Sequence, residues 1–258
     1  ARPSVVKRSA AIIKEMGFTP VLGKNLLASH GFSAGTDRER LDDLGHALRD
    51  ESIRAVWCIT GGYGCLPLLA DLPYGEFAAS PKIVLGCEDA SHLTLALHKR
   101  SGVVTFHGPN ADRVVNRIIF ERVKRAFTHG DYDVLQAEDA VLPEFAFSAV
   151  EGIGKGAYLP SLVSLFRTEY EPDLDGRVLL LDDVRERNDI LDRWFTTLYI
   201  SGKLSAVAAL GLGMFEGCDS RGAFNMLSFE ELAYDRLVEM ALPSCFNLPF
   251  GQGGDHVL

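Results

Sequence analysis

Residues 82–109, KIVLGCEDASHLTLALHKRSGVVTFHGP, predict a buried strand, a tight turn and a helix. Residues 82–86 form a short apolar run of the kind found in strands that are covered on both faces. The apolar residues that follow Asp89 recur at helical spacing, and Gly102 stands where glycine commonly ends a helix. A chain that turns this sharply from strand to helix presents one side chain to a cleft, and here that side chain is Glu88.

The residue at such a turn often carries the chemistry of the protein. In hydrolases it is commonly a serine or a cysteine that lies beside backbone N–H groups able to stabilise an oxyanion. This chain instead has a carboxylate, with Cys87 before it and Asp89 after it. The turn therefore predicts a chemical site at Glu88 whose nucleophile is not a serine hydroxyl.

The first half of the chain alternates between predicted helices and strands. Helical periodicity covers residues 4–18, 37–50, 65–72 and 90–102, and predicted strands cover 19–23, 53–60 and 82–86. This alternation favours a parallel sheet that is covered by helices on both faces. Ligands of such sheets bind at the carboxyl ends of the strands. The glycine-rich turn GGYG at 61–64 and the turn at Glu88 would both lie there.

A second α/β unit is predicted after a change in sequence character. Residues 126–150 lack sustained periodicity and are expected to connect a domain at 1–125 to one at 151–258. In the second domain we expect helices at 156–166 and 188–202 and strands at 176–184 and 205–217. The chain begins directly on a helix and has no obvious closing element, so we expect a first strand and a last segment to lie outside this sequence.

Composition excludes several classes of function. A net charge of −9 argues against a general nucleic-acid or anionic-membrane binder, which needs a basic surface. No apolar run reaches the length needed to span a bilayer, and no secretory signal is visible. The five cysteines form no CxxC pair and are odd in number, which indicates reduced thiols and a cytoplasmic location. These cysteines are expected to be mostly buried small residues.

Four stretches together resemble the LD-carboxypeptidases, a family of serine peptidases that includes the microcin-immunity peptidases. They are WCITGGYGCLPLL at 57–69, LGCEDASHLTLALHKRSGVVTFHGP at 85–109, EYEPDLDGRVLLLDDV at 169–184 and LPFGQGGD at 248–255. The resemblance implies a flavodoxin-like N-terminal domain, a smaller C-terminal α/β domain, an active site between them and a homodimer. It also implies cleavage of an amide bond next to a free carboxylate by a Ser–Glu–His triad, without a metal or other cofactor.

All three triad positions differ in this sequence. The resemblance places Glu88 at the serine position, Asp182 at the glutamate position and Gln252 at the histidine position. A serine nucleophile needs a base within hydrogen-bond reach, and that base needs an orienting partner. Glutamine exchanges no proton near neutral pH, and Glu88 has no hydroxyl to activate. Serine-type hydrolysis by these three residues is therefore not expected.

Other positions carried over from the family complete the predicted site. Gly61, Gly62 and the N–H of Asp89 are expected to form the oxyanion-type turn, and Cys87 and Tyr158 are expected to line the substrate site. Tyr158 replaces an asparagine of the family pattern. Another departure is Thr60, which stands where the family often has arginine.

Several residues could replace the missing groups, and each has a plainer interpretation. Cys87 could be a nucleophile or a packed residue, and Cys65 at a helix start could be a thiolate or a small residue under the turn. His256 could occupy the vacant histidine position or lie on a surface loop. His107 is expected to be a structural hydrogen-bonding residue, and Ser91 is expected to support the turn.

The remaining groups favour proton transfer. Two carboxylates from different domains can divide general acid and base roles, because burial and mutual repulsion separate their pKa values. We expect Glu88 and Asp182 to act in cyclisation, elimination or isomerisation of a small peptide-like or polyketide-like metabolite, with Gln252 orienting it. The alternatives are a catalytically inactive binding or scaffold protein, and a residual carboxypeptidase.

Overall fold

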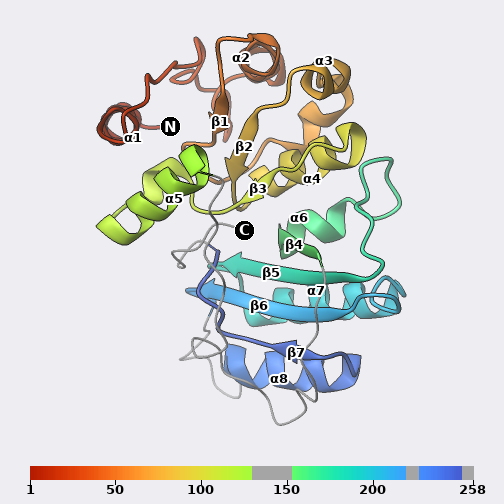
Figure 1. The fold of residues 1–258 in the computed structure, drawn as a ribbon. Coiled ribbons are helices and arrows are strands. Elements are labelled where there is room, and N and C mark those ends of the chain that lie inside the picture. Colours follow the sequence, from red (N-terminus) through yellow and green to blue (C-terminus); the bar gives the residue numbers. More distant parts are fainter. Residues whose placement is uncertain (130–152, 219–226, 252–258) are drawn as a thin grey trace.

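The structure, a computed structural model, describes residues 1–129, 153–218 and 227–251. These residues form two α/β units, each built on a parallel sheet, that stack one above the other (Figure 1). The predicted fold class is confirmed. No helix in the described part of the chain is long and apolar enough to cross a membrane.

The N-terminal unit contains a parallel sheet of order β1-β2-β3. Its elements are α1 (Pro3–Glu15), α2 (Asp37–Arg49), β1 (Ala55–Trp57), η1 (Leu66–Asp71), α3 (Tyr74–Ala79), β2 (Ile83–Gly86), α4 (Ala90–Ser101), β3 (Phe106–His107), η2 (Ala111–Arg113) and α5 (Arg117–His129).

Helix α4 follows β2 directly and is the central helix of this unit. Eight consecutive residues from its start, 90–97, are buried, among them the polar side chains of Ser91, His92 and Thr94. The helix ends at Gly102, whose φ of 73° lies in the left-handed region that glycine adopts without steric cost. The strand, turn and helix predicted from residues 82–102 are therefore confirmed.

The C-terminal unit contains a parallel sheet of order β4-β5-β6-β7. Its elements are β4 (Ile153–Tyr158), α6 (Leu159–Ser164), β5 (Arg177–Val184), α7 (Asn188–Ile200), β6 (Ala209–Glu216), α8 (Phe229–Met240) and β7 (Ser244–Cys245).

The two units share one hydrophobic core. A single cluster of buried side chains includes Leu93 and Leu97 of α4 together with Leu159 and Leu162 of α6. Helices α4 and α6 pack against each other at this point, and β3 contacts β4. The carboxyl ends of β2 and β5 thereby come close to each other at the boundary between the units.

Two predicted elements differ from the structure, and the predicted domain boundaries stay a prediction. Residues 19–23 form no strand, and Val21 is 65% exposed, because the short apolar run has no strand to pair with. The helix predicted at 156–166 begins as the end of β4, since pairing with β5 overrides the poor strand propensity of its glycines. The predicted domain boundary at 125 falls inside α5, which continues to His129.

Candidate active site

Glu88 occupies a strained turn between β2 and α4. Its φ is 55°, a left-handed conformation that costs a residue with a side chain roughly 1–2 kcal/mol. The turn is closed by the Ser91 N–H, which donates to the Glu88 carbonyl at 2.9 Å. Backbone strain of this kind is retained where the surrounding structure imposes it, and it gathers at functional sites.

The Glu88 side chain folds onto the GGYG turn. A methyl group at Gly61 would overlap the Glu88 carboxyl group, so only glycine allows this contact. The N–H of Gly62, a residue with a φ of 134°, donates a hydrogen bond to the same carboxyl group. The carboxyl group of Glu88 therefore occupies the turn that was predicted to stabilise a substrate oxyanion.

The surroundings of Glu88 raise its pKa to about 7. Burial is the main cause, because it disfavours the charged form. The nearby Asp112 and Asp182 carboxylates add to the rise, while Arg113 and the Gly62 N–H oppose it. At neutral pH Glu88 therefore populates both its acid and its base form, which suits general acid–base catalysis.

Asp182 lies at the end of β5 and has no exposed surface. Its Oδ1 accepts a hydrogen bond from His107 Nε2 at 2.9 Å, and its Oδ2 has no partner among the described residues. Oδ2 packs against Gly251, where a methyl group would overlap it. Gln252, which is expected to orient the substrate, lies outside the described residues. His107 instead holds one oxygen of this carboxyl group.

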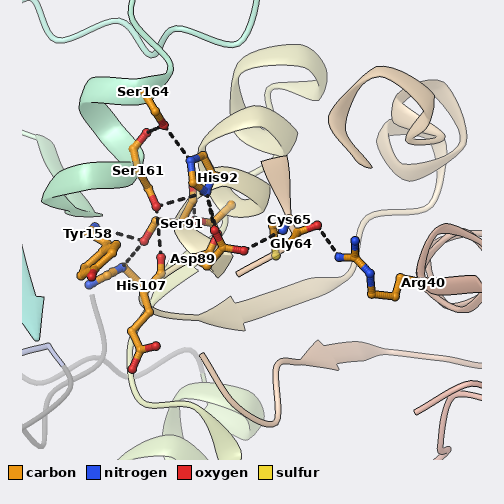
Figure 2. Close-up of polar contacts among 12 residues, drawn as sticks. Arg40, Gly64, Cys65, Asp89, Ser91, His92, His107, Tyr158, Ser161 and Ser164 are labelled. Carbon is orange, nitrogen blue, oxygen red and sulfur yellow. Dashed lines mark hydrogen bonds and ion pairs between the residues drawn. The ribbon is translucent and has the colours of Figure 1, made fainter. Parts of the chain in front are cut away.

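A chain of hydrogen bonds continues from His107 into both units (Figure 2). His107 Nδ1 lies 3.3 Å from Ser91 Oγ, and the Tyr158 N–H donates to the same oxygen at 3.0 Å. Nε2 donates a hydrogen bond to Asp182 and therefore carries the ring proton. Nδ1 is then unprotonated and accepts a hydrogen bond from the Ser91 hydroxyl. Ser91 and His107 thus support the turn from inside the protein, as predicted. Ser91 is fully buried and meets no substrate.

Asp183 is a further carboxyl group that the sequence analysis missed. Burial raises its pKa to about 8, against the opposing effects of the Val184 N–H, which donates to Oδ1 at 2.7 Å, and of the nearby Tyr158 hydroxyl. Asp183 follows Asp182 on β5, and the side chains of successive strand residues point to opposite faces. The Asp183 carboxyl group lies beside the side chain of Tyr158.

Neither cysteine near the turn has the properties of a nucleophile. Cys87 is fully buried, and its N–H donates to Asn110 Oδ1 at 3.2 Å. Burial and the Asp182 charge raise the pKa of its thiol. The pKa of Cys65 is also raised, by burial and by Asp89, which favours the interpretation of Cys65 as a small residue under the turn. Cys87 is a packed residue and is not part of the proposed substrate site.

The side chain of Asp89 connects the two turns of the site. Its Oδ2 accepts the Cys65 N–H at 2.6 Å, and its Oδ1 lies 3.1 Å from His92 Nδ1. Burial alone would raise its pKa, but the hydrogen bonds from His92 and Cys65 outweigh that effect and lower it. Asp89 therefore remains ionised and fixes the end of the GGYG turn to the start of α4.

Two predicted residues cannot be placed, and a third is at the surface. Gln252 and His256 lie outside the described residues. Thr60 is exposed. Within residues 1–129, 153–218 and 227–251, no group of three or more histidine, cysteine or acidic side chains is arranged to hold a metal ion.

Two family models match this chain. The LD-carboxypeptidase N-terminal domain matches residues 1–108, and the LD-carboxypeptidase C-terminal domain matches residues 151–258. The murein tetrapeptide carboxypeptidase of Pseudomonas aeruginosa is 31% identical over 247 residues, covering 91% of this chain and 79% of that protein.

Solved structures agree with this relationship. The muramoyltetrapeptide carboxypeptidase from Oxalobacter formigenes superposes with a TM-score of 0.86 and 25% identity, covering 100% of this chain and 88% of that chain. The microcin C7 self-immunity protein MccF, solved in complex with aspartyl sulfamoyl adenosine, gives a TM-score of 0.81 at 22% identity. That match covers 98% of this chain and 85% of the MccF chain, and it supports the fold.

Proposed function

Because this chain belongs to the LD-carboxypeptidase family, we propose that it uses the family fold for proton transfer by Glu88 rather than for serine-type hydrolysis. The observation that carries this proposal is a carboxyl group with a pKa of about 7, held at the apex of a strained turn. A catalytic group is most effective when its pKa lies near the working pH. The reaction class is cyclisation, elimination or isomerisation.

Glu88 acts as the base in the proposed reaction. Its carboxylate takes a proton from a carbon or heteroatom of the substrate and becomes a carboxylic acid. A neutral carboxyl group accepts hydrogen bonds less strongly than a carboxylate. The Gly62 N–H, which donates to Glu88 in the resting site, is thereby released towards the negative charge that develops on the substrate.

A second group must return a proton, and the pair of Tyr158 and Asp183 is suited to this role. Tyr158 is partly exposed, and its hydroxyl lies near the buried Asp183 carboxyl group. With a pKa of about 8, Asp183 is mostly protonated at neutral pH and can replace the proton that Tyr158 gives to the substrate. Asp182, the second acid–base residue expected from the sequence, is assigned a positioning role through His107. Gln252 is proposed to orient the substrate.

The proposed substrate class rests on the substrates of the family and on the proposed proton transfer by Glu88. The relatives named above act on murein tetrapeptide, and MccF was solved with an aminoacyl sulfamoyl adenosine. A small molecule that contains an amide or a carbonyl group next to an acidic hydrogen fits both this background and the proposed chemistry. The Gly62 N–H would then meet the carbonyl oxygen, with the acidic hydrogen at Glu88.

A binding protein without catalysis is the second candidate. The observation that favours it is that the Glu88 carboxyl group already accepts the Gly62 N–H, which a substrate would otherwise use. Under this alternative Glu88 fills a site that has lost its activity. Its raised pKa would then be a consequence of burial without a chemical role.

Deuterium exchange tests the two candidates. The protein is incubated in D2O with a panel of N-acyl amino acids and small β-keto amides, and exchange at acidic C–H positions is followed by NMR. We expect exchange that Glu88→Gln lowers by roughly 10²–10⁴-fold. Glu230→Gln, at an exposed residue of α8, should leave the rate unchanged. Full exchange in a folded Glu88→Gln variant would contradict the proposal, as would a panel that binds by calorimetry without exchange.

A further inference from the structure

His92 lies between a carboxylate and an exposed serine. Its Nδ1 is 3.1 Å from Asp89 Oδ1, and its Nε2 is 2.7 Å from Ser164 Oγ (Figure 2). Asp89 and His92 belong to the turn and helix α4 of the N-terminal unit, whereas Ser164 is the last residue of α6 in the C-terminal unit. This Ser–His–Asp arrangement uses none of the three family triad positions.

The hydrogen bonds of His92 fix its tautomer. Nδ1 is surrounded by the Asp89 carbonyl at 3.0 Å, the Asp89 carboxylate at 3.1 Å and Ser161 Oγ at 3.2 Å. Asp89 offers only acceptors, so Nδ1 carries the proton, and in the neutral ring Nε2 is then an acceptor. The Ser164 hydroxyl can donate either to Nε2 at 2.7 Å or to the Ser161 carbonyl at 2.9 Å. The shorter contact is with the imidazole base.

Burial divides this group into a protected base and an accessible hydroxyl. Asp89 and His92 are each only 7% exposed, whereas Ser164 is exposed. Asp89 is kept ionised by hydrogen bonds from His92 and from the Cys65 N–H, so it can stabilise an imidazolium ion. The serines of the other two serine–imidazole contacts among the described residues, Ser91 with His107 and Ser161 with His92 Nδ1, are buried, so a reagent cannot reach them.

We propose that Ser164 is a nucleophile activated by His92 and oriented through Asp89, and that it accepts acyl groups from activated esters. Ser164 Oγ attacks the ester carbonyl carbon, and its proton moves to His92 Nε2. The bond to the leaving alkoxide or phenolate then breaks, and that group takes the proton from His92. The product is an ester on Ser164. Water can release the acyl group by the same proton transfers in reverse.

Chemical labelling tests this site without knowledge of a natural substrate. The full chain is treated with a fluorophosphonate probe, which forms a P–O bond to an activated serine and releases fluoride, and the adduct is located by peptide mass spectrometry. 4-Nitrophenyl acetate serves as the ester. We expect one adduct, on Ser164, and release of 4-nitrophenol. Both should be absent in Ser164→Ala and present in Glu88→Gln.

A second serine provides the matched control. Ser205 is also exposed, and its hydroxyl also donates to a backbone carbonyl, that of Gly202 at 2.9 Å, but it has no hydrogen bond to an imidazole among the described residues. Ser205→Ala should label like the unmodified protein. His92→Gln should lower the labelling rate by roughly 10²-fold or more, with its fold checked by circular dichroism. If His92→Gln does not fold, the pH dependence of labelling replaces it, with a rate that rises with pH as expected for an imidazole base.

Three outcomes would overturn the proposal. They are the absence of an adduct on Ser164, equal labelling of Ser164 and Ser205, and a labelling rate that is independent both of His92→Gln and of pH. Labelling of Ser164 that persists in Glu88→Gln would distinguish this reactivity from that of the site around Glu88.

Discussion

His107 and Asp182 form a buried hydrogen-bonded pair across the boundary between the two units. Nε2 of His107 lies 2.9 Å from Oδ1 of Asp182, and the two side chains are 2% and 0% exposed. The sequence resemblance assigns Asp182 to the position of the family's triad glutamate, and its partner among the described residues is a histidine on β3. The pair therefore joins β3 to β5 beside the candidate active site.

Removing His107 should destabilise the protein more than neutralising Asp182. His107→Ala leaves a buried carboxyl oxygen without its donor and opens a cavity, which should cost roughly 3 kcal/mol. Asp182→Asn keeps an acceptor oxygen for Nε2 and should cost about 1 kcal/mol. The free energy of unfolding in urea measures both. His46→Ala, which removes an exposed contact with Asp50, is the control and should cost less than about 1 kcal/mol. Equal costs for His107→Ala and His46→Ala would contradict the prediction.

Asp183 should make the folded state less stable as the pH rises. Its pKa increases from 3.8 to about 8 on folding, so between these values the unfolded chain loses the proton first and is favoured. This contribution to stability is complete below about pH 4 and is lost as the pH rises through about 8. Asp183→Asn carries no charge and retains an acceptor for the Val184 N–H. Urea unfolding measures the free energy of unfolding of Asp183→Asn minus that of the unmodified protein. This difference should be more positive at pH 9 than at pH 5. A difference that does not change with pH would refute this.

Gly61 and Glu88 should show strong energetic coupling. Gly61→Ala places a methyl group on the Glu88 carboxyl group and forces it out of the turn. In a Glu88→Ala background that overlap disappears, so the same substitution should cost less by about 1 kcal/mol or more. Gly62→Ala provides the comparison, because its cost arises from a φ of 134° and should persist in both backgrounds. Additive effects for Gly61 and Glu88 would show that the carboxyl group does not occupy the turn in solution.

The protein should not cleave murein tetrapeptide. The sequence resemblance places Glu88 and Gln252 at the positions of the family's nucleophile and base, and glutamate and glutamine cannot perform those roles in serine-type hydrolysis. Glu88→Ser alone should also be inactive, because Gln252 still accepts no proton. Chromatography of the peptide products measures this, with the murein tetrapeptide carboxypeptidase of Pseudomonas aeruginosa as the positive control. Cleavage by the unmodified chain would favour the residual carboxypeptidase alternative.

Local pattern in the sequence was sufficient to locate the strand, turn and helix around Glu88. A short apolar run, a glycine at the helix end and a helical repeat are each set by neighbouring residues, so the sequence carries them directly. The strand expected at 19–23 is wrong for the opposite reason. Apolar residues favour a strand only where another strand pairs with them, and Val21 has none.

The hydrogen-bonding partners of the site were harder to predict. Asp183 was missed because its proximity to Tyr158 depends on how β4 pairs with β5, two strands that are separated in the sequence. The contact between His92 and Ser164 joins residues 72 positions apart, through the packing of α4 on α6. Such contacts are determined by the assembly of the two units, which no local pattern records.

The Glu88 carboxyl group accepts the Gly62 N–H, so it competes with any bound anion for that donor. An anionic molecule that enters the GGYG turn must displace a carboxylate tethered beside it, whose effective concentration is very high. Protonation of Glu88 weakens that competitor, and its pKa of about 7 sets the range in which this happens. Affinity for anions at this turn should therefore increase as the pH falls below neutrality, which makes local acidity a determinant of when the turn is available.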